Sequence, residues 1–258
     1  MNKLTIVKVG GKVVEDRKLL RQLIIHFCTI EGNKILVHGG GKKATEIAQK
    51  LGIETVMHDG RRITDENMLS VAVMVYAGLT NKNIVAQIQS KGFDAVGLSG
   101  ADLNIIQSQK RKVVEIDFGF VGDVETVDAQ KINFFISNNI IPVFCAITHD
   151  NNGQLLNTNA DTIASEVAIA MSKLFDVELI YCFEKKGVLQ NIDDENSVIP
   201  LLTKDFYCEL KQNKFITEGM IPKLDNCFNS LDKGVKEIKI CSSEALENKI
   251  IFGTKIIL

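Results

Sequence analysis

The chain has 258 residues, and its 30 Lys and Arg nearly balance its 32 Asp and Glu, leaving a net charge of −2. Hydrophobic residues make up 45% of the chain, an ordinary fraction for a globular protein. No uninterrupted apolar run reaches the roughly 18 residues of a membrane span, and the balanced charge argues against a dedicated nucleic-acid binder.

The first part of the chain alternates predicted strands and helices. An apolar strand over 4–9 ends in Gly10-Gly11, and apolar residues recur at helical spacing over 17–30. A second strand over 34–38 ends in three glycines, and a helix follows over 42–51. This β-α-β-α order predicts a parallel sheet covered by helices.

The segment over 64–90 is predicted to be one long helix. Thr64, Asp65 and Glu66 resemble an N-cap and a first turn, and no proline interrupts the stretch. The next segment, 95–126, has short alternating runs broken by glycines. This pattern predicts a hairpin-rich patch on the edge of the sheet.

The second part of the chain returns to the α/β rhythm. The apolar runs predict strands over 140–147, 177–183 and 235–241, an added edge strand over 254–258, and helices over 161–173, 203–214 and 220–233. The predicted fold is therefore a three-layer α/β/α sandwich with a mainly parallel central sheet. In such open α/β folds, ligands bind at the carboxyl ends of the strands.

The cysteines and histidines look structural. The six cysteines are scattered without a CxxC pair, several of them in apolar runs, so we expect buried thiols in a reducing, cytoplasmic compartment. The first residues lack the apolar region of a signal peptide, which agrees with that location. The four histidines are expected to be structural: His26, His38, His58 and His149.

Two glycine clusters follow two predicted strands, Gly10-Gly11 and Gly39-Gly40-Gly41. Glycines let backbone N–H groups approach an anion closely, although a tight strand-to-helix turn needs glycine for steric reasons alone. The second cluster also fits a loose dinucleotide fingerprint that ends in Ala44, with Asp59 downstream. That alternative ranks low, because the turn lies on the second strand. No Walker A motif is present.

Two further motifs open helices. In LLNTNAD (155–161), one Asn or Asp would suffice as a helix cap, so Asp161 is a candidate for holding a lysine or a metal-bound water. In TEGMIPK (217–223), Lys223 falls in the first helical turn, where a cation opposes the helix dipole. A nearby bound anion would offset that cost, and a solvated surface lysine is the alternative.

Together, these motifs resemble the amino acid kinase family. They are VKVGG (7–11), VHGGGK (37–42), GRRIT (60–64), LLNTNAD (155–161) and TEGMIPK (217–223), in order over nearly the whole chain. Within that family the likeness is greatest to the members that act on N-acetyl-L-glutamate. The resemblance implies ATP-dependent phosphorylation of the γ-carboxylate of N-acetyl-L-glutamate in arginine biosynthesis. It also implies Mg²⁺ carried by the nucleotide, with no metal ligands from the protein.

The resemblance implies a role for each matching residue. Lys8 would contact the transferred phosphoryl group, Lys223 would bridge the ATP phosphates, and Asp161 would hold both lysines. The phosphate-binding residues would be Gly10 and Gly11, and the substrate-binding residues Gly40, Gly41, Arg62 and Asn157. The nucleotide would lie near Glu184, Lys185, Lys186, Gly187, Val188, Leu189, Phe215, Ile216 and Thr217. The two lysines at 185 and 186 depart from the family's usual Ser/Thr-Asp-Val-x-Gly stretch, and they would bind phosphate or remain solvated.

The resemblance also implies two lobes with different ligands, and an oligomeric state. Residues 1–170 would form an N-terminal lobe for the acyl amino acid, and residues 171–258 a C-terminal lobe for ATP. A homodimer would form through the long helix over 64–90. The family's arginine-inhibited hexamers have a helix before the first strand, so no such feedback is expected here.

Several alternatives remain open from the sequence. Within the family, the acceptor could be N-succinyl-L-glutamate, or the chain could be a UMP or carbamate kinase. From other classes, it could be a non-catalytic module that binds an amino acid or a nucleotide, or a dinucleotide-dependent oxidoreductase. Because Lys8, Asp161 and Lys223 are all present, we favour catalysis.

Overall fold

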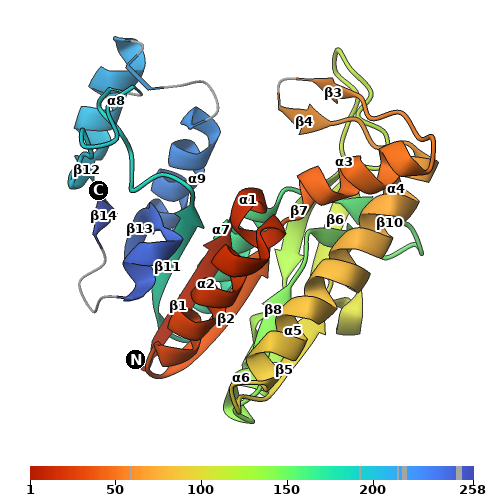
Figure 1. Cartoon of the computed structure of the whole chain (residues 1–258), viewed down its shortest axis with the longest axis horizontal. Helices are drawn as coiled ribbons and strands as arrows, with labels where there is room; N and C mark the ends of the chain where they lie inside the picture. Colours follow the sequence, from red (N-terminus) through yellow and green to blue (C-terminus); the bar gives the residue numbers. More distant parts are fainter. Residues whose placement is uncertain (59, 192, 214, 217–219, 248–251) are drawn as a thin grey trace.

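An eight-stranded sheet runs through the centre of the protein in the computed structural model (Figure 1), which describes residues 1–58, 60–191, 193–213, 215–216, 220–247 and 252–258. The strands of this sheet are β1 (Lys3–Val9), β2 (Asn33–His38), β5 (Ala95–Leu98), β8 (Ile141–Phe144), β11 (Asp176–Phe183), β12 (Leu201–Thr203), β13 (Glu237–Ser242) and β14 (Gly253–Ile257). Their order is β12-β14-β13-β11-β1-β2-β8-β5. Only the β13–β14 pair is antiparallel.

The side chains of β1 show why its sequence reads as a continuous apolar run. Leu4 and Ile6 pack in one apolar cluster, whereas Val7 and Val9 pack in another on the opposite face. All four are fully buried. A strand covered on both faces has no polar side, which is typical of parallel sheets between two helical layers.

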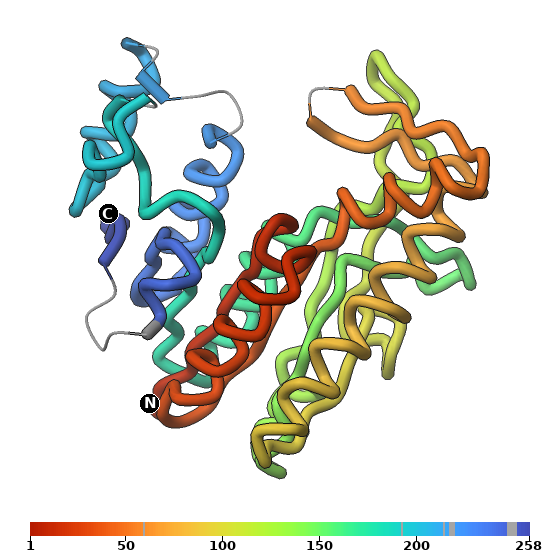
Figure 2. The backbone as a smooth tube through the Cα atoms, in the orientation of Figure 1, coloured from red at the N-terminus to blue at the C-terminus, as the bar shows by residue number. Residues whose placement is uncertain are grey.

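Helices cover both faces of the sheet. One layer contains α1 (Gly11–Glu15), α2 (Arg17–Thr29), α5 (Asn81–Gln89) and the 3₁₀ turn η3 (Ser243–Glu247); the other contains α6 (Ala129–Ser137), α7 (Ala160–Met171), α8 (Lys204–Gln212) and α9 (Ile221–Asp232). The predicted three-layer sandwich is therefore confirmed. Figure 2 shows that both ends of the chain lie in the same half of the molecule.

A second, four-stranded sheet stands beside the first. It contains β6 (Ile106–Lys110), β7 (Gly122–Val127), β9 (Ile147–His149) and β10 (Leu155–Asn157), in the order β10-β9-β6-β7. The predicted hairpin is thus present as β6–β7, but it belongs to this sheet. From the segment 95–126, β5 alone joins the central sheet, where it forms one edge. The single strand predicted over 140–147 is wrong, because β8 ends at Phe144 and β9 starts in the other sheet.

The strand at the C-terminus, β14, is not an edge strand as predicted. It lies between β13 and β12, and β12 forms the edge. The short segment Leu201–Thr203 has too few residues to show a strand pattern in the sequence.

The long helix predicted over 64–90 is present in three parts. It runs through α4 (Glu66–Val73), the π-helical η1 (Met74–Thr80) and α5. Asp65, not Thr64, caps it, because the Asp65 carboxylate accepts the Met68 N–H at 2.7 Å. By length and composition alone this helix could also cross a membrane, although polar residues divide it into short apolar runs. Half of its most apolar window is buried inside the protein.

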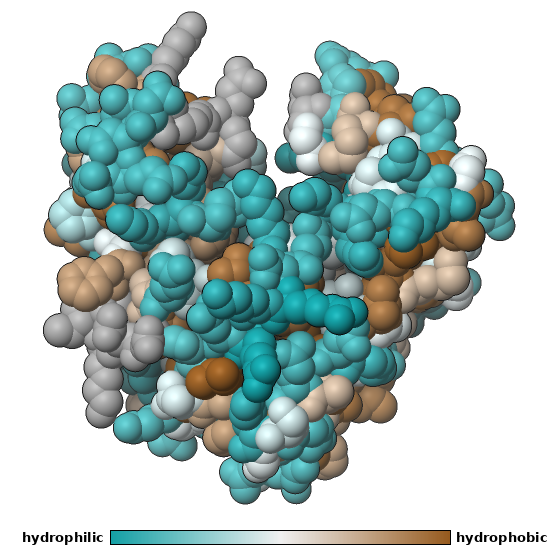
Figure 3. Space-filling model, in the orientation of Figure 1, coloured by the Kyte–Doolittle hydropathy of each residue, from teal (hydrophilic) through white to brown (hydrophobic). Residues whose placement is uncertain are grey.

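The carboxyl ends of β1, β2 and β11 point toward a hollow in the surface. The helix α3 (Gly41–Lys50) and the hairpin of β3 (Met57–His58) and β4 (Arg61–Arg62) lie on one side of it, and α8 lies on the other (Figure 1). The space-filling view is hollowed between these two parts (Figure 3).

Candidate active site

Lys8 lies near the carboxyl end of β1 and is only 9% exposed. It has the same strand parity as Leu4 and Ile6, so its side chain points into the layer that contains α7 and α9. There its Nζ lies 2.6 Å from Oδ1 of Asp161. A buried lysine requires such a partner, since an unpaired charge away from water is strongly disfavoured.

Asp161 is the second residue of α7 and is 7% exposed. The capping role falls to Asn159, whose side chain accepts the Asp161 N–H at 2.7 Å. The Asp161 carboxylate is therefore left to face the two lysines. Both predicted roles of this motif are therefore present: Asn159 caps the helix, and Asp161 holds the lysines.

Lys223 is the third residue of α9 and donates a hydrogen bond to Oδ2 of Asp161. It is therefore not the solvated surface lysine of the alternative interpretation. Burial alone would raise the pKa of Asp161, but Lys8 and Lys223 outweigh burial and lower it to about 2. The Lys8 ammonium is close to Oδ1, but that oxygen has no well-directed hydrogen bond among the described residues.

Tyr181 supports this arrangement from β11. Its hydroxyl lies 2.7 Å from the Ser165 hydroxyl and 3.4 Å from the Asp161 carbonyl oxygen, and burial raises its pKa well above the usual value. Tyr181 thus ties the first turns of α7 to the sheet. Sequence analysis missed it, because a tyrosine in an apolar strand gives no signal beyond that of core packing.

The first glycine turn joins β1 to α1. The Gly10 N–H donates to the Cys182 carbonyl at 2.8 Å, and a Cβ at position 10 would meet that oxygen and the Phe183 Cβ at 3.3 Å. A larger residue at position 10 would therefore have to shift the packing against β11 by a few tenths of an ångström. The Gly11 N–H has no acceptor in the part of the chain that the structure describes, so it is available to an anion.

The second glycine turn joins β2 to α3 and packs against Tyr76. A Cβ at position 40 would come within 2.9 Å of the Tyr76 ring, so no other residue fits there without displacing it. His38, the last residue of β2, contacts the same turn. Its Nδ1 lies 2.8 Å from the Gly39 carbonyl, and burial lowers its pKa to about 4, so it is neutral and structural as predicted.

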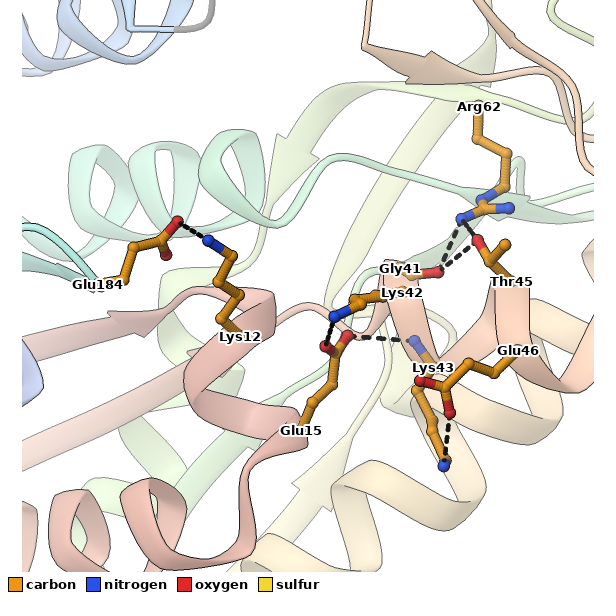
Figure 4. Close-up of polar contacts among 9 residues, drawn as sticks. All are labelled: Lys12, Glu15, Gly41, Lys42, Lys43, Thr45, Glu46, Arg62 and Glu184. Atoms are coloured by element: carbon orange, nitrogen blue, oxygen red, sulfur yellow. Dashed lines mark hydrogen bonds and ion pairs between the residues drawn. The ribbon is translucent and has the colours of Figure 1, made fainter. Parts of the chain in front are cut away.

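Arg62 reaches the second glycine turn from the β3–β4 hairpin (Figure 4). Its Nη2 donates to the Gly41 carbonyl at 2.7 Å and to the Thr45 hydroxyl at 2.8 Å. Asn157, at the end of β10, is 9% exposed and donates to the Thr64 hydroxyl at 3.0 Å. Tyr76 and Thr45 were not singled out from the sequence; the available signal was a single aromatic residue, Tyr76, in the long helix.

The segment predicted to contact a nucleotide starts at the end of β11. Oε1 of Glu184 lies 3.0 Å from Nζ of Lys12, which follows the first glycine turn (Figure 4). Lys185 is paired with Glu195 at 2.9 Å, and Lys186 is exposed.

The remaining residues of this segment differ in exposure. The Val188 side chain is buried, and its N–H donates to the Thr254 hydroxyl at 2.8 Å. Gly187 packs against Thr254, and Leu189 forms a bridge with Val198. Phe215 is 60% exposed and Ile216 is buried. Two sequence candidates, Thr217 and Asp59 of the dinucleotide fingerprint, lie outside the described residues.

The chemistry available at this site is the binding of anions. Two lysines, an arginine and the amides of two glycine turns surround the carboxyl ends of β1 and β2. No group of three or more potential metal ligands occurs among the described His, Cys, Asp and Glu side chains. Such a set of donors suits a reaction in which negative charge shifts between oxygen atoms.

Comparison with known proteins agrees with this geometry. The sequence profile of the amino acid kinase family matches residues 3–242. The acetylglutamate kinase of Phocaeicola vulgatus is 54% identical over 95% of both chains, and that of Bacteroides thetaiotaomicron is 53% identical over 98% of both. The solved N-acetylglutamate synthase of Neisseria gonorrhoeae has the same fold, with a TM-score of 0.84 and 18% identity over 99% of this chain and 59% of that one.

We expect Asp161→Asn to destabilise the protein in a pH-dependent way. The folded-state pKa of about 2 lies below the ordinary 3.8, so the carboxylate contributes about 2 kcal/mol at pH 7. That contribution is lost as the pH falls from about 4 toward 2. Urea unfolding should show a difference between wild type and variant that shrinks by about half at pH 3. A difference that is constant from pH 7 to pH 3 would contradict the ion-pair explanation.

Proposed function

The chain belongs to the amino acid kinase family, and from that premise we propose that it phosphorylates the γ-carboxylate of N-acetyl-L-glutamate with ATP in arginine biosynthesis. The observation that carries the proposal is the meeting of Lys8 and Lys223 on the buried carboxylate of Asp161. Relatives that are more than half identical over nearly the full chain, such as the two described above, are acetylglutamate kinases, which supports this acceptor.

The acceptor needs no general base. A γ-carboxylate has an ordinary pKa near 4.3 and is already ionised at pH 7. The nucleophile is therefore ready on binding, and the enzyme's task is to align it with the γ-phosphorus and to neutralise charge on the transferred group. This agrees with a site whose histidine, His38, is buried and neutral.

The two lysines divide that task. Lys8 donates to the phosphoryl group in transfer, and Lys223 donates on the leaving side, where charge builds on the β-phosphate. Asp161 keeps both ammonium groups in place before the substrates arrive, so little reorganisation is needed during reaction. The loosely directed contact of Lys8 leaves that lysine able to turn toward the phosphoryl oxygens.

The acyl amino acid lies over residues 1–170. Arg62 and Asn157 hold its α-carboxylate and its amide, and the amides of Gly11, Gly40 and Gly41 donate to the phosphoryl group and the reacting carboxylate. Arg62 now donates to a neutral carbonyl, so an incoming carboxylate is a stronger partner for it.

ATP lies over residues 171–258. Phe215 offers an exposed ring, and the amide groups after β11 offer hydrogen bonds. Asp161 already faces two lysines, so Mg²⁺ would be held by the nucleotide phosphates rather than by this carboxylate. When bound, the metal neutralises phosphate charge.

The protein acts as a cytoplasmic homodimer. All six cysteines are free thiols, as suits a reducing compartment. The long helix exposes Met74 (55%) and Leu79 (47%), and pairing with a second copy would bury this apolar face.

The activity is tested by trapping the acyl phosphate with hydroxylamine. Purified protein receives ATP, Mg²⁺ and one acceptor at a time, and hydroxamate and ADP are both measured. The acceptors are N-acetyl-L-glutamate, N-succinyl-L-glutamate, free glutamate, aspartate, carbamate and UMP. We expect hydroxamate with N-acetyl-L-glutamate. Hydroxamate only with the succinyl compound would change the acyl group, and ADP without hydroxamate would indicate an acceptor such as UMP. Binding of ATP without turnover of any acceptor would favour a non-catalytic module.

Replacement of either lysine should slow the chemical step. We expect Lys8→Ala and Lys223→Ala to lower kcat by about 10²–10³, with smaller changes in KM, because each removes a donor to the transition state. Lys131→Ala removes an exposed lysine paired with Asp128 on α6 and serves as the control. A Lys8→Ala enzyme with the kcat of the wild type would refute the assignment.

The assembly is tested by light scattering. We expect the wild type to have the mass of two chains, and Leu79→Glu to have the mass of one, because a charge buried in an apolar interface is strongly disfavoured. Phe134→Glu, an exposed position on α6, should remain a dimer. A hexameric wild type, or a Leu79→Glu dimer, would be inconsistent with this interface.

A further inference from the structure

We propose that Glu15 is a positioning residue for the substrate. Although Glu15 belongs to α1, it caps α3, the helix that follows the second glycine turn. This inference rests on the proposed function, in which that turn binds the acyl amino acid. Glu15 is the last residue of α1, and it lies beside α3 in space (Figure 4).

The start of α3 lacks a cap of its own. The first N–H groups of any helix have no partner within the helix, and a polar side chain at the N-cap position usually accepts one of them. Here the N-cap residue is Gly40, which has no side chain, and Tyr76 prevents any other residue from replacing it. The turn that must hold the substrate is thus the one that cannot cap itself.

Glu15 supplies the missing acceptor. Its Oε1 accepts the Lys43 N–H at 3.1 Å, which is the third amide of α3 and a usual target of an N-cap side chain. Its Oε2 lies 3.9 Å from the Lys42 ammonium. The Glu15 side chain is only 12% exposed, and its Oε1 lies 3.7 Å from where a Cβ of Gly11 would be. One carboxylate therefore lies against both glycine turns.

The contact between Glu15 and the Lys43 amide leaves the first two amides of α3 free. The N–H groups of Gly41 and Lys42 have no acceptor within the described ranges of the chain, whereas the next amide is occupied by Glu15. Arg62 holds the same turn from the other side through the Gly41 carbonyl. With its carbonyl and its third amide fixed by two side chains, the turn presents its first two amides in one orientation.

For this cap, the oxygen of Glu15 that accepts the Lys43 N–H matters more than the negative charge of its carboxylate. Burial raises the pKa of Glu15, even though Lys42 and the Lys43 amide act to lower it. The surroundings therefore do not favour ionisation of this carboxyl group. A neutral side chain of the same length should cap α3 as well as Glu15 does. The length of the side chain and its charge can therefore be tested separately.

Three variants of the full-length protein make that separation. Glu15→Ala removes the acceptor, Glu15→Asp keeps the charge but loses the reach, and Glu15→Gln keeps both the reach and an oxygen. We expect Ala and Asp to raise the KM for N-acetyl-L-glutamate about five- to tenfold, as the loss of one cap interaction implies. The KM for ATP and kcat should change less than threefold, and Gln should resemble the wild type.

A matched control comes from the same helix. Glu46 pairs with the side chain of Lys43 at 2.9 Å and does not touch its amide (Figure 4). Glu46→Ala therefore removes a nearby negative charge but not the cap, and its kinetics should match those of the wild type. Hydrogen exchange provides a readout independent of activity, because the Lys43 amide should lose protection in Glu15→Ala and keep it in Glu15→Gln.

The results separate this inference from the proposed function. If the wild type phosphorylates no N-acyl glutamate, the function fails, whereas amide exchange at Lys43 still tests the cap. If the wild type is active and Glu15→Ala or Glu15→Asp has an unchanged KM, the positioning role is wrong. A Glu15→Gln variant as impaired as Ala would also overturn it. Should Ala fail to fold, Asp and Gln carry the same comparison.

Discussion

The site depends on one buried carboxylate between two lysines. Lys8, Asp161 and Lys223 come from a strand and from the first turns of two helices, and none would be stable in a buried site without the others. Their meeting requires β1 to lie at the centre of the sheet, with its even-numbered side chains directed at α7 and α9. In the proposed reaction, the same contact keeps two cations ready where negative charge shifts.

The position of β1 also brings together the segments that we propose bind the two substrates. It pairs with β2 on one side and with β11 on the other, so the turn after β2 and the segment after β11 flank the turn after β1. The ion pair of Lys12 and Glu184 spans the second of these boundaries. Because such an exposed pair adds little stability, the nucleotide of the proposed function would displace it at low cost.

The second glycine turn, where we propose that the acyl amino acid binds, is held by side chains from three different elements. Tyr76 from the π-helical segment, Arg62 from the β3–β4 hairpin and Glu15 from α1 all contact the second glycine turn or the start of α3. A π-helical segment inside a long helix often marks a functional position, and here it aims a ring at Gly40. Glycines give this turn its shape, and the three side chains keep it fixed.

The sequence by itself determined the layers and most strands and helices, because apolar periodicity and helix-start motifs are local signals. Lys8, Asp161 and Lys223 were identified together only because their motifs resemble those of the amino acid kinase family. Only the tertiary structure decided where the chain changes sheet after Phe144, which strand forms the edge, and that Asp65 rather than Thr64 caps the long helix. It alone also paired Glu15 with the Lys43 amide, 28 residues away. Such contacts depend on which elements become neighbours, and no spacing along the chain encodes that directly.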